Sequence, residues 1–316
     1  MIEADLAFAD SLRGIIGWNQ TMRDWQRLLA AQPQGCFIAE WDSSAVGTAT
    51  TTRYGAGLAW IGMLLVHPDH RGRGVGSALL EHCLNHLSGT PCIKLDATPL
   101  GKKLYDKLGF REEWPLKRWE ARGFDLSHER IGRADLQVGP TNTFMGRERL
   151  SSGQMAFEIS RANASHTQPA ISTALEPWDA SSLARVERFD SQMFGAPRQR
   201  MLAGLAADSF KTLICASADG AVAGYGFLRR GSKALYLGPV VALSVTVGVS
   251  LIKALLAEAK GQPVYWDAPD GNAAVSSLLK ELGFVPQRQL VRMYLGRNEY
   301  PCDASRYFAI ADPAIG

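Results

Sequence analysis

Residues 61–77 read IGMLLVHPDHRGRGVGS, and this stretch decides the fold. Ile61–Val66 is a short and almost continuous apolar run, which predicts a strand buried on both faces of a sheet. Pro68 ends the strand, because proline lacks a backbone donor and has a fixed φ. A glycine-rich turn follows, and the residues from Ser77 to Leu84 have helical spacing. Such a turn aims backbone N–H groups at an anion and the helix N-terminus adds partial positive charge, so we predict a phosphate-binding turn.

The spacing of the glycines excludes two common phosphate-binding motifs. The dinucleotide pattern G-x-G-x-x-G fails, because Ser77 stands where Gly72 and Gly74 would require the third glycine. The P-loop pattern fails as well, since no Gly-Lys-Ser/Thr follows. A tight turn without a ligand would explain one glycine, but it accounts poorly for three glycines and two arginines in six residues.

The segment R-x-x-G-x-G at residues 71–76, after a strand that ends in Val-His-Pro, resembles the pyrophosphate-binding turn of the GNAT acyl-CoA N-acyltransferases. The resemblance implies acetyl-CoA as the acyl donor, without a metal ion. It also implies that the turn holds the pyrophosphate and that exposed strand backbone faces the pantetheine amides. The residues implied to bind the cofactor are Leu64, Leu65, Val66, Arg71, Gly72, Arg73, Gly74, Val75, Gly76, Ser77, Thr98, Gly101 and Tyr105.

Composition and charge limit the remaining classes. A chain of 316 residues predicts roughly two domains, and a net charge of +3 is too small to argue for a nucleic-acid or membrane-surface partner. Five scattered cysteines without a C-x-x-C pair argue against a disulfide framework and against zinc, and they favour a reducing compartment. Neither a signal peptide nor an apolar run of membrane-spanning length is present. We therefore expect a cytoplasmic protein.

The first 120 residues alternate between helical and extended patterns. Two helices are expected at the start, and Thr98 and Pro99 predict the N-cap and first position of a later helix. The GNAT resemblance implies this order for an α/β domain with a mixed sheet, from Met1 to Glu120. Such a domain normally opens with a further strand, so either the true start lies upstream or another segment covers that edge. The expected extended segments are Gly35–Trp41, Ala45–Arg53, Leu58–Val66, Pro91–Ala97 and one from Phe110.

From Ala170 onward the first half recurs in altered form. Residues 237–239 (LGP) parallel residues 61–63 (IGM), and a Leu-Gly-Phe triplet ends a helix in both halves. We predict a catalytic GNAT domain at residues 1–120, a linker at 121–169 and a degenerate GNAT-like domain at 170–316. This arrangement predicts a monomer that forms a pseudo-dimer within one chain, or a homodimer.

The two copies differ at the residues that carry chemistry. Leu243 and Thr246 stand where the first copy has Arg71 and Gly74, so the second copy cannot build the same phosphate cradle. Counting back from the shared Leu-Gly-Phe, Leu279 stands in place of Tyr105. We expect the chemistry in the first copy, with the second copy as partner and pocket wall.

Acyl transfer to an amine requires a proton or a hydrogen bond for the leaving thiolate and a group that takes a proton from the amine. The resemblance places an acid tyrosine at Tyr105, one helical turn after Gly101, where a glycine would let pantetheine pass. With a pKa of about 10 against about 8.5 for a thiol, Tyr105 is expected to act mainly by hydrogen bonding. About one primary amine in a thousand is neutral at pH 7, so a base or a water chain must help. Glu40, at a strand end near the expected centre, is the first candidate for the base.

These features predict N-acetylation of a small-molecule amine by direct attack on acetyl-CoA through a tetrahedral intermediate. Two alternatives stay open. One is a non-catalytic CoA-binding sensor or regulatory module, and the other is a protein amine acetyltransferase, which needs an open acceptor groove. The segment Trp18–Gln20 between the first two helices either walls the acceptor pocket or fills the space between the helices.

Overall fold

The computed structural model of the chain describes residues 1–123, 174–179, 181–217, 219–300 and 302–316. The predicted linker at 121–169 lies outside these residues from 124 onward. The helices are α1 (Leu6–Ile16), α2 (Met22–Ala31), α3 (Val75–His86), α4 (Pro99–Lys107), α5 (Ser182–Phe194), α6 (Gln199–Ala207), α7 (Val245–Leu256) and α8 (Ala273–Glu281). The strands are β1 (Cys36–Trp41), β2 (Ser44–Tyr54), β3 (Leu58–Val66), β4 (Cys92–Ala97), β5 (Arg111–Ala121), β6 (Leu175–Pro177), β7 (Ser209–Ala216), β8 (Val222–Arg229), β9 (Leu235–Ala242), β10 (Val264–Pro269), β11 (Val285–Gly296) and β12 (Tyr307–Ala309). In this described part of the chain, every helix is too short or too polar to cross a lipid bilayer.

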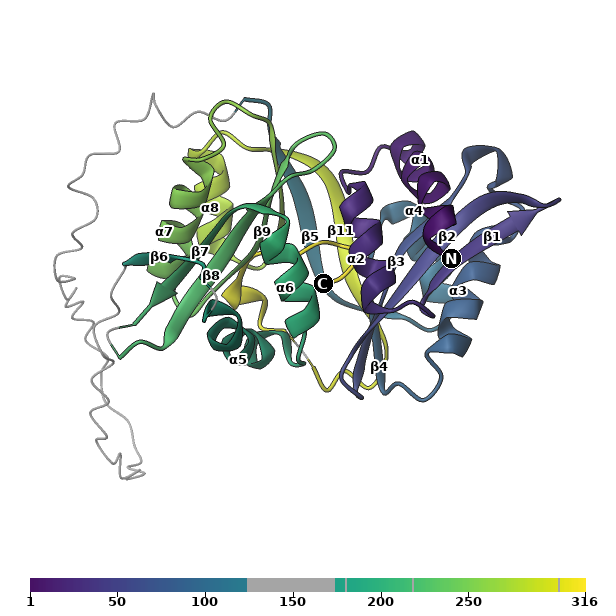
Figure 1. Cartoon of the computed structure of the whole chain (residues 1–316), viewed down its shortest axis with the longest axis horizontal. Helices are drawn as coiled ribbons and strands as arrows, with labels where there is room; N and C mark the ends of the chain where they lie inside the picture. Colours follow the sequence, from purple (N-terminus) through teal and green to yellow (C-terminus); the bar gives the residue numbers. More distant parts are fainter. Residues whose placement is uncertain (124–173, 180, 218, 301) are drawn as a thin grey trace, which may run out of the picture.

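Within the described residues, twelve strands form one mixed sheet (Figure 1). Its order is β1-β2-β3-β4-β11-β5-β10-β9-β8-β7-β6, and β12 pairs with β9 outside this path. The apolar runs predicted as strands form β1 to β4. The central run, β3, is buried along most of its length, as a strand covered on both faces must be. The expected α/β class with a mixed sheet is confirmed.

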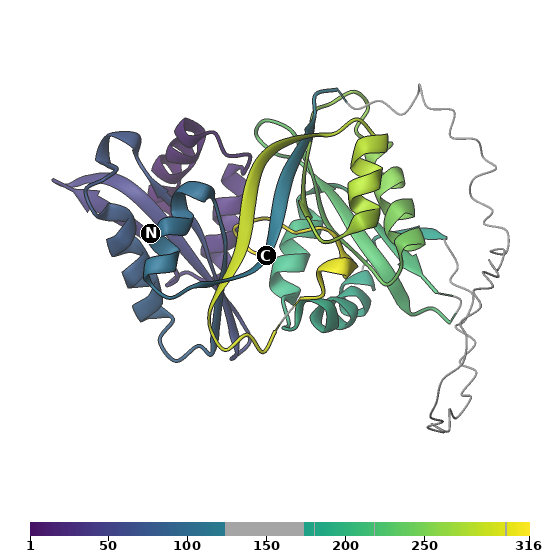
Figure 2. The ribbon, with the colours of Figure 1, turned by 180° about the vertical axis from the view of Figure 1, so that it is seen from behind.

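The two halves of the chain exchange their central strands. β11, which comes late in the sequence, lies between β4 and β5, while β5 pairs with β10 of the other half. Figure 2 shows the two long strands side by side in the middle of the molecule. A boundary near residue 120 therefore divides the sequence but not the sheet, and the predicted domain limits stay a prediction.

Each exchanged strand brings an arginine to an aspartate of the other half. Arg292 of β11 donates through Nε and Nη2 to the two carboxylate oxygens of Asp96, at 2.8 and 2.9 Å. Arg118 of β5 makes the same bidentate contact to Asp267 of β10, with Nε 2.8 Å from Oδ1. All four side chains are buried. Because the loss of one partner would leave a buried charge unpaired, these ion pairs fix the register between the halves.

The helices cover both faces of the sheet. On one face, α1 and α2 of the first half and α5 and α6 of the second half share one hydrophobic core (Figure 1). On the opposite face, α3 and α4 pack over the first half and α7 and α8 over the second, each pair with a core of its own. The shared core and the exchanged strands join the two copies into one body.

Two parallel pairs of strands separate at equivalent points. β3 and β4 are paired only where Leu58–Trp60 of β3 lie beside Cys92–Lys94 of β4. β9 and β10 are paired only where Leu235–Leu237 of β9 lie beside Val264–Trp266 of β10. Beyond these points each pair diverges and leaves a space at the carboxyl end of its strands, which is where open α/β sheets usually bind ligands.

Residues 307–316, here called the tail, fill the space in the second half and reach the space in the first. The tail is buried along its whole length. Equivalent glycines of the repeat make room for its backbone. A Cβ on Gly238 of β9 would lie 2.1 Å from Ile310 O, and a Cβ on Gly62 of β3 would lie 2.3 Å from Ala314 O. The tail therefore touches both copies at the same place in the fold.

Candidate active site

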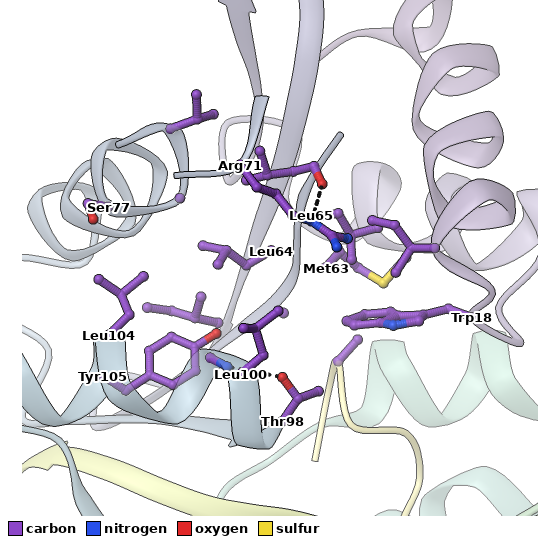
Figure 3. Close-up of a pocket in the computed structure, with 18 of the residues that line it drawn as sticks. Trp18, Met63, Leu64, Leu65, Arg71, Ser77, Thr98, Leu100, Leu104 and Tyr105 are labelled. Atoms are coloured by element: carbon purple, nitrogen blue, oxygen red, sulfur yellow. Dashed lines mark hydrogen bonds between the residues drawn. The ribbon is translucent and has the colours of Figure 1, made fainter. Parts of the chain in front are cut away.

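A cavity of about 760 Å³ opens where β3 and β4 diverge. Its walls are β3, the glycine-rich turn and the first turn of α3, together with α4, the loop after α1 and the tail (Figure 3). Apart from Arg73, all of the residues predicted to bind the cofactor line it: Leu64, Leu65, Val66, Arg71, Gly72, Gly74, Val75, Gly76, Ser77, Thr98, Gly101 and Tyr105. The structure thus brings two separate sequence motifs to one space.

The glycine-rich turn presents backbone N–H groups to the cavity. Gly72 and Gly74 have φ values of +75° and +84°, a conformation that residues with a Cβ rarely adopt. Gly74 is the N-cap of α3, and its carbonyl accepts from Ala78 N at 3.0 Å. The N–H groups of residues 75–77 precede that bond and have no acceptor within the helix. With the helix dipole they fit an anion such as a phosphate.

The two arginines of the turn take different directions. Arg71 Nε donates to Val66 O at 3.3 Å, which holds the side chain at the cavity along the end of β3 (Figure 3). The guanidinium carbon of Arg73 instead lies 5.7 Å from the centroid of the Trp41 ring, on the edge strand β1. Arg73 is therefore not part of the cavity lining, and its contact with the cofactor stays a prediction.

β3 is irregular where it lines the cavity. Its register against β2 shifts between Thr48 and Thr50, and Met63 has a φ of +48°. The Thr48 hydroxyl holds this bulge by donating to Met63 O at 2.8 Å. Because β4 pairs with β3 only as far as Trp60, residues 61–66 have no strand partner on that side among the described residues. Extended backbone of this kind can bind the amides of a ligand as it would bind another strand.

Tyr105 lies on α4 with its hydroxyl pointing into the cavity (Figure 3). Its side chain is largely buried, and this burial raises the pKa of the phenol to about 12. Gly101 was predicted to let a ligand pass, but a Cβ there would lie 2.9 Å from the Tyr105 ring, so the glycine also makes room for the tyrosine. The phenol is thus kept protonated at the cavity wall as a hydrogen-bond donor.

The end of β4 and the start of α4 complete this wall. Thr98 caps α4 as predicted, because its Oγ1 accepts from Gly101 N at 3.2 Å and Pro99 occupies the first position. Asp96 also lines the cavity, although both of its carboxylate oxygens are bound by Arg292. Sequence reasoning missed this pair, since its members are 196 residues apart and share no motif.

Glu40, the predicted base, does not belong to this cavity. It is exposed on the edge strand β1 and lines a second cavity of about 450 Å³ with His82 of α3. β2 and β3 separate β1 from β4, so the structure does not bring Glu40 to Tyr105. The prediction is corrected for a physical reason: the residues of a strand do not reveal its place in the sheet.

The loop between α1 and α2 contributes Trp18 to the cavity wall. Its neighbours are buried and hold the loop to the second half. Asn19 Oδ1 accepts from the backbone N of residues 233 and 234, at 2.9 and 3.0 Å. Gln20 Nε2 donates to Asp312 of the tail at 2.9 Å. Trp18 lines the cavity and also packs against the shared hydrophobic core, so both alternatives for this loop apply to it. The tail residues Pro313 and Ala314, which no motif marked, also line the cavity.

The equivalent space in the second half has lost these features. The first turn of α7 is capped by its own Ser244, whose Oγ accepts from Val247 N at 3.3 Å. Phe308 of the tail packs so closely that a Cβ on Gly248 would lie 2.4 Å from its ring. Leu279 is buried in place of a tyrosine. Among the described residues, no group of three or more His, Cys, Asp and Glu side chains is placed to hold a metal ion.

A mixed sheet that opens beside a glycine-rich helix N-terminus, with a phenol at the opening, is the arrangement that the resemblance to the acyl-CoA N-acyltransferases implied. A family model described as an acetyltransferase (GNAT) domain matches residues 32–112, and a second model with the same description matches residues 186–309. The chain belongs to the GNAT acetyltransferases, carries two GNAT domains in tandem, and is an acyltransferase enzyme.

Relatives and solved structures agree with this family. The chain is 22% identical over 259 residues to the uncharacterized N-acetyltransferase YitH of Bacillus subtilis (strain 168), covering 82% of this chain and 77% of that protein. It is 23% identical over 284 residues to the holothin acyltransferase of Pseudoalteromonas sp. (strain SANK 73390), covering 89% and 81%. A putative acetyltransferase from Pyrococcus horikoshii has a TM-score of 0.73 at 19% identity, covering 99% of this chain and 93% of that one. A tandem GNAT protein from the clavulanic acid biosynthesis pathway has a TM-score of 0.55 at 15% identity, covering 98% and 97%. At these identities, the two structures share the fold.

Proposed function

We propose that the chain transfers an acetyl group from acetyl-CoA to the amine of a small molecule, by direct attack of the amine on the thioester. The observation that carries this proposal is one cavity that joins an anion cradle, an unpaired stretch of strand backbone and the Tyr105 hydroxyl. These three features match in kind the pyrophosphate, the pantetheine amides and the thioester of the donor. Acetyl-CoA supplies the acyl group in activated form.

Each part of the cavity has a separate task in this proposal. Arg71 and the N–H groups of residues 75–77 bind the pyrophosphate, and the backbone of residues 64–66 binds the pantetheine amides. As the C–N bond forms and the C–S bond breaks, negative charge moves to the sulfur, where the Tyr105 hydroxyl stabilises it. Because the phenol has a pKa of about 12, Tyr105 gives a hydrogen bond and keeps its proton.

Three observations support a small-molecule acceptor, acyl transfer and turnover. Trp18 and the tail wall one end of the cavity and limit the space for an acceptor there, whereas a polypeptide acceptor would need an open groove. The relative named holothin acyltransferase supports acyl transfer as the reaction. The Tyr105 hydroxyl at the cavity supports turnover over a purely sensing role.

Calorimetric titration of acetyl-CoA into wild type and into the double variant Arg71→Ala/Gly74→Val tests the cradle. We expect wild type to bind one equivalent and the double variant to lose binding, because valine is strained at a φ of +84° and fills the cradle. Gly89→Val is the matched control: Gly89 has a φ of +82°, nothing lies within 4 Å of its Cβ position, and it follows the other end of α3. Absence of binding by wild type, or an equal loss in Gly89→Val, would overturn the proposal.

The release of CoA in the presence of amines separates the enzyme from the sensor. We expect amine-dependent release of free thiol by wild type. Binding of acetyl-CoA without thiol release from any amine would favour the regulatory module.

A further inference from the structure

Among the residues that the structure describes, the cavity lining offers no side chain that is free to take a proton from an amine at its acceptor end. The titratable residues of its lining are His70, Arg71, Asp96 and Tyr105. Arg292 occupies both carboxylate oxygens of Asp96, whose side chain is 0% exposed. Tyr105 is protonated at neutral pH, and Arg71 is a cation. His70 belongs to the turn that leads into the phosphate cradle, at the other end of the cavity.

Two further charged groups stand behind the wall of the acceptor end. Asp312 does not line the cavity, and its Oδ1 accepts from Gln20 Nε2 and from Ala314 N, each at 2.9 Å. The guanidinium carbon of Arg288 lies 5.7 Å from the centroid of the Trp18 ring. A positive charge close to this ring opposes an ammonium group held against it.

The wall itself is apolar, and one part of it is flat. Figure 3 shows the Trp18 indole projecting into the cavity beside Met63. The backbone of Trp18 is fixed, because its carbonyl accepts from Arg13 Nη1 and from Ser232 Oγ, each at 3.2 Å. An indole carried on a backbone held in this way can stack on another planar ring. The apolar residues that line this end are Ile16, Trp18, Met63, Pro313 and Ala314.

We infer that the acceptor is a planar aromatic amine whose nitrogen is weakly basic and therefore neutral at pH 7, and which carries no second cationic group. The inference rests on the proposed function and names its substrate class. An alkylamine is neutral in about one molecule in a thousand at pH 7, and the described lining of the cavity supplies no base that would deprotonate it. An arylamine is already neutral, so it needs no base before it attacks.

Acetyl transfer to such an amine then needs no catalytic base. The amine lone pair forms the C–N bond at the thioester carbonyl carbon, and the C–S bond breaks. Sulfur leaves as a thiolate that accepts a hydrogen bond from Tyr105, while the proton lost by nitrogen passes to water. The products are an N-arylacetamide and CoA.

A panel of amines of similar bulk tests the substrate class. With acetyl-CoA at saturation, CoA release is measured for 4-methylaniline, benzylamine, cyclohexylmethylamine and spermidine from about pH 6 to about pH 9. We expect kcat/KM at pH 7 to be highest for 4-methylaniline by about tenfold or more and to stay flat with pH, whereas that of benzylamine rises as its neutral fraction grows. An alkylamine or polyamine that equals 4-methylaniline at pH 7 would overturn the inference and leave the proposed function in place. Failure of acetyl-CoA to bind would remove both.

Binding of the product gives a readout that does not depend on turnover. Calorimetry with N-(4-methylphenyl)acetamide in the presence of CoA should show binding that Trp18→Ala weakens about three- to tenfold and Trp18→Phe largely restores. The affinity for CoA should not change in either variant. Ile16→Ala should weaken product binding as well, and Ile15→Ala serves as its matched control, because Ile15 is 55% exposed and lies outside the cavity lining. Equal product affinity in wild type and Trp18→Ala, or no product binding by wild type, contradicts the inference.

Discussion

Replacement of Tyr105 by phenylalanine removes one hydroxyl from the cavity wall and keeps the ring. The ring packs with its centroid 5.8 Å from that of Phe110, and phenylalanine preserves this contact. Burial raises the pKa of the phenol to about 12, so transfer of its proton to a thiolate of pKa about 8.5 is unfavourable, and the hydroxyl acts as a donor. A hydrogen bond to a charged group contributes about 1.5–3 kcal/mol. The expected loss in kcat for Tyr105→Phe is therefore about 10- to 150-fold.

The assay compares kcat at saturating acetyl-CoA and amine with the affinity for acetyl-CoA from calorimetry. The affinity should change less than about twofold, because the hydroxyl acts on charge that develops only during the reaction. The raised pKa keeps the phenol neutral as the pH rises, so the ratio of wild-type to variant kcat should stay constant from about pH 7 to about pH 10. Tyr265→Phe on β10 removes a hydroxyl outside the cavity lining and is the matched control.

Three outcomes would refute this reasoning. A kcat for Tyr105→Phe within twofold of wild type would show that the hydroxyl does not meet the leaving group. A ratio that falls toward one by about pH 9 would show that the phenol ionises, against the expected direction of its pKa. A similar loss in Tyr265→Phe would assign the effect to the fold.

Three further variants test the surroundings of the site. Gly62→Ala places a Cβ 2.3 Å from Ala314 O, so it should displace the tail. We expect a higher KM for the amine in steady-state kinetics and a loss of stability of about 1–3 kcal/mol in urea unfolding. An unchanged KM would contradict the role of the tail. Arg292→Met removes the cation that opposes the burial-raised pKa of Asp96, so the carboxyl must either stay charged without a partner or take up a proton. This should cost about 3–5 kcal/mol in urea unfolding, and the double variant Asp96→Asn/Arg292→Met should recover part of the loss. Phe308→Ala should lower the free energy of unfolding by about 3–5 kcal/mol, because Phe308 is buried. It should not create a second binding site, so a calorimetric stoichiometry above one acetyl-CoA per chain would contradict the loss of the second cradle.

The parts of the site that sequence reasoning predicted are encoded locally. The turn at residues 71–76 needs its glycines for positive φ values, and Thr98 and Pro99 mark the start of α4 by their own chemistry. Such signals depend on a few neighbouring residues, so they can be read without knowledge of the rest of the fold. The role of Tyr105 was implied by the GNAT resemblance, and the structure places this residue on α4 with its side chain at the cavity.

The parts that it missed depend on contacts between distant segments. β5 and β11 each carry an ordinary strand pattern, and nothing in that pattern says that they change places in the sheet. The base prediction failed at Glu40 for the same reason, since β1 turned out to be an edge strand. Pro313 and Ala314 belong to no motif, and their place in the wall is set by the glycine at position 62.

The exchange of β5 and β11 also bears on how the protein is made. While the chain leaves the ribosome, the first half has all of its cofactor-cradle residues, but β4 keeps an open edge until residues 285–296 emerge. An open strand edge in a nascent chain invites pairing with other chains, so this half depends on the late segment, or on a chaperone, to avoid aggregation. A fragment that stops before β11 would also leave Asp96 without its arginine. The first half is therefore not a free-standing module, and gene truncations or fusions that separate it from β11 should yield insoluble protein.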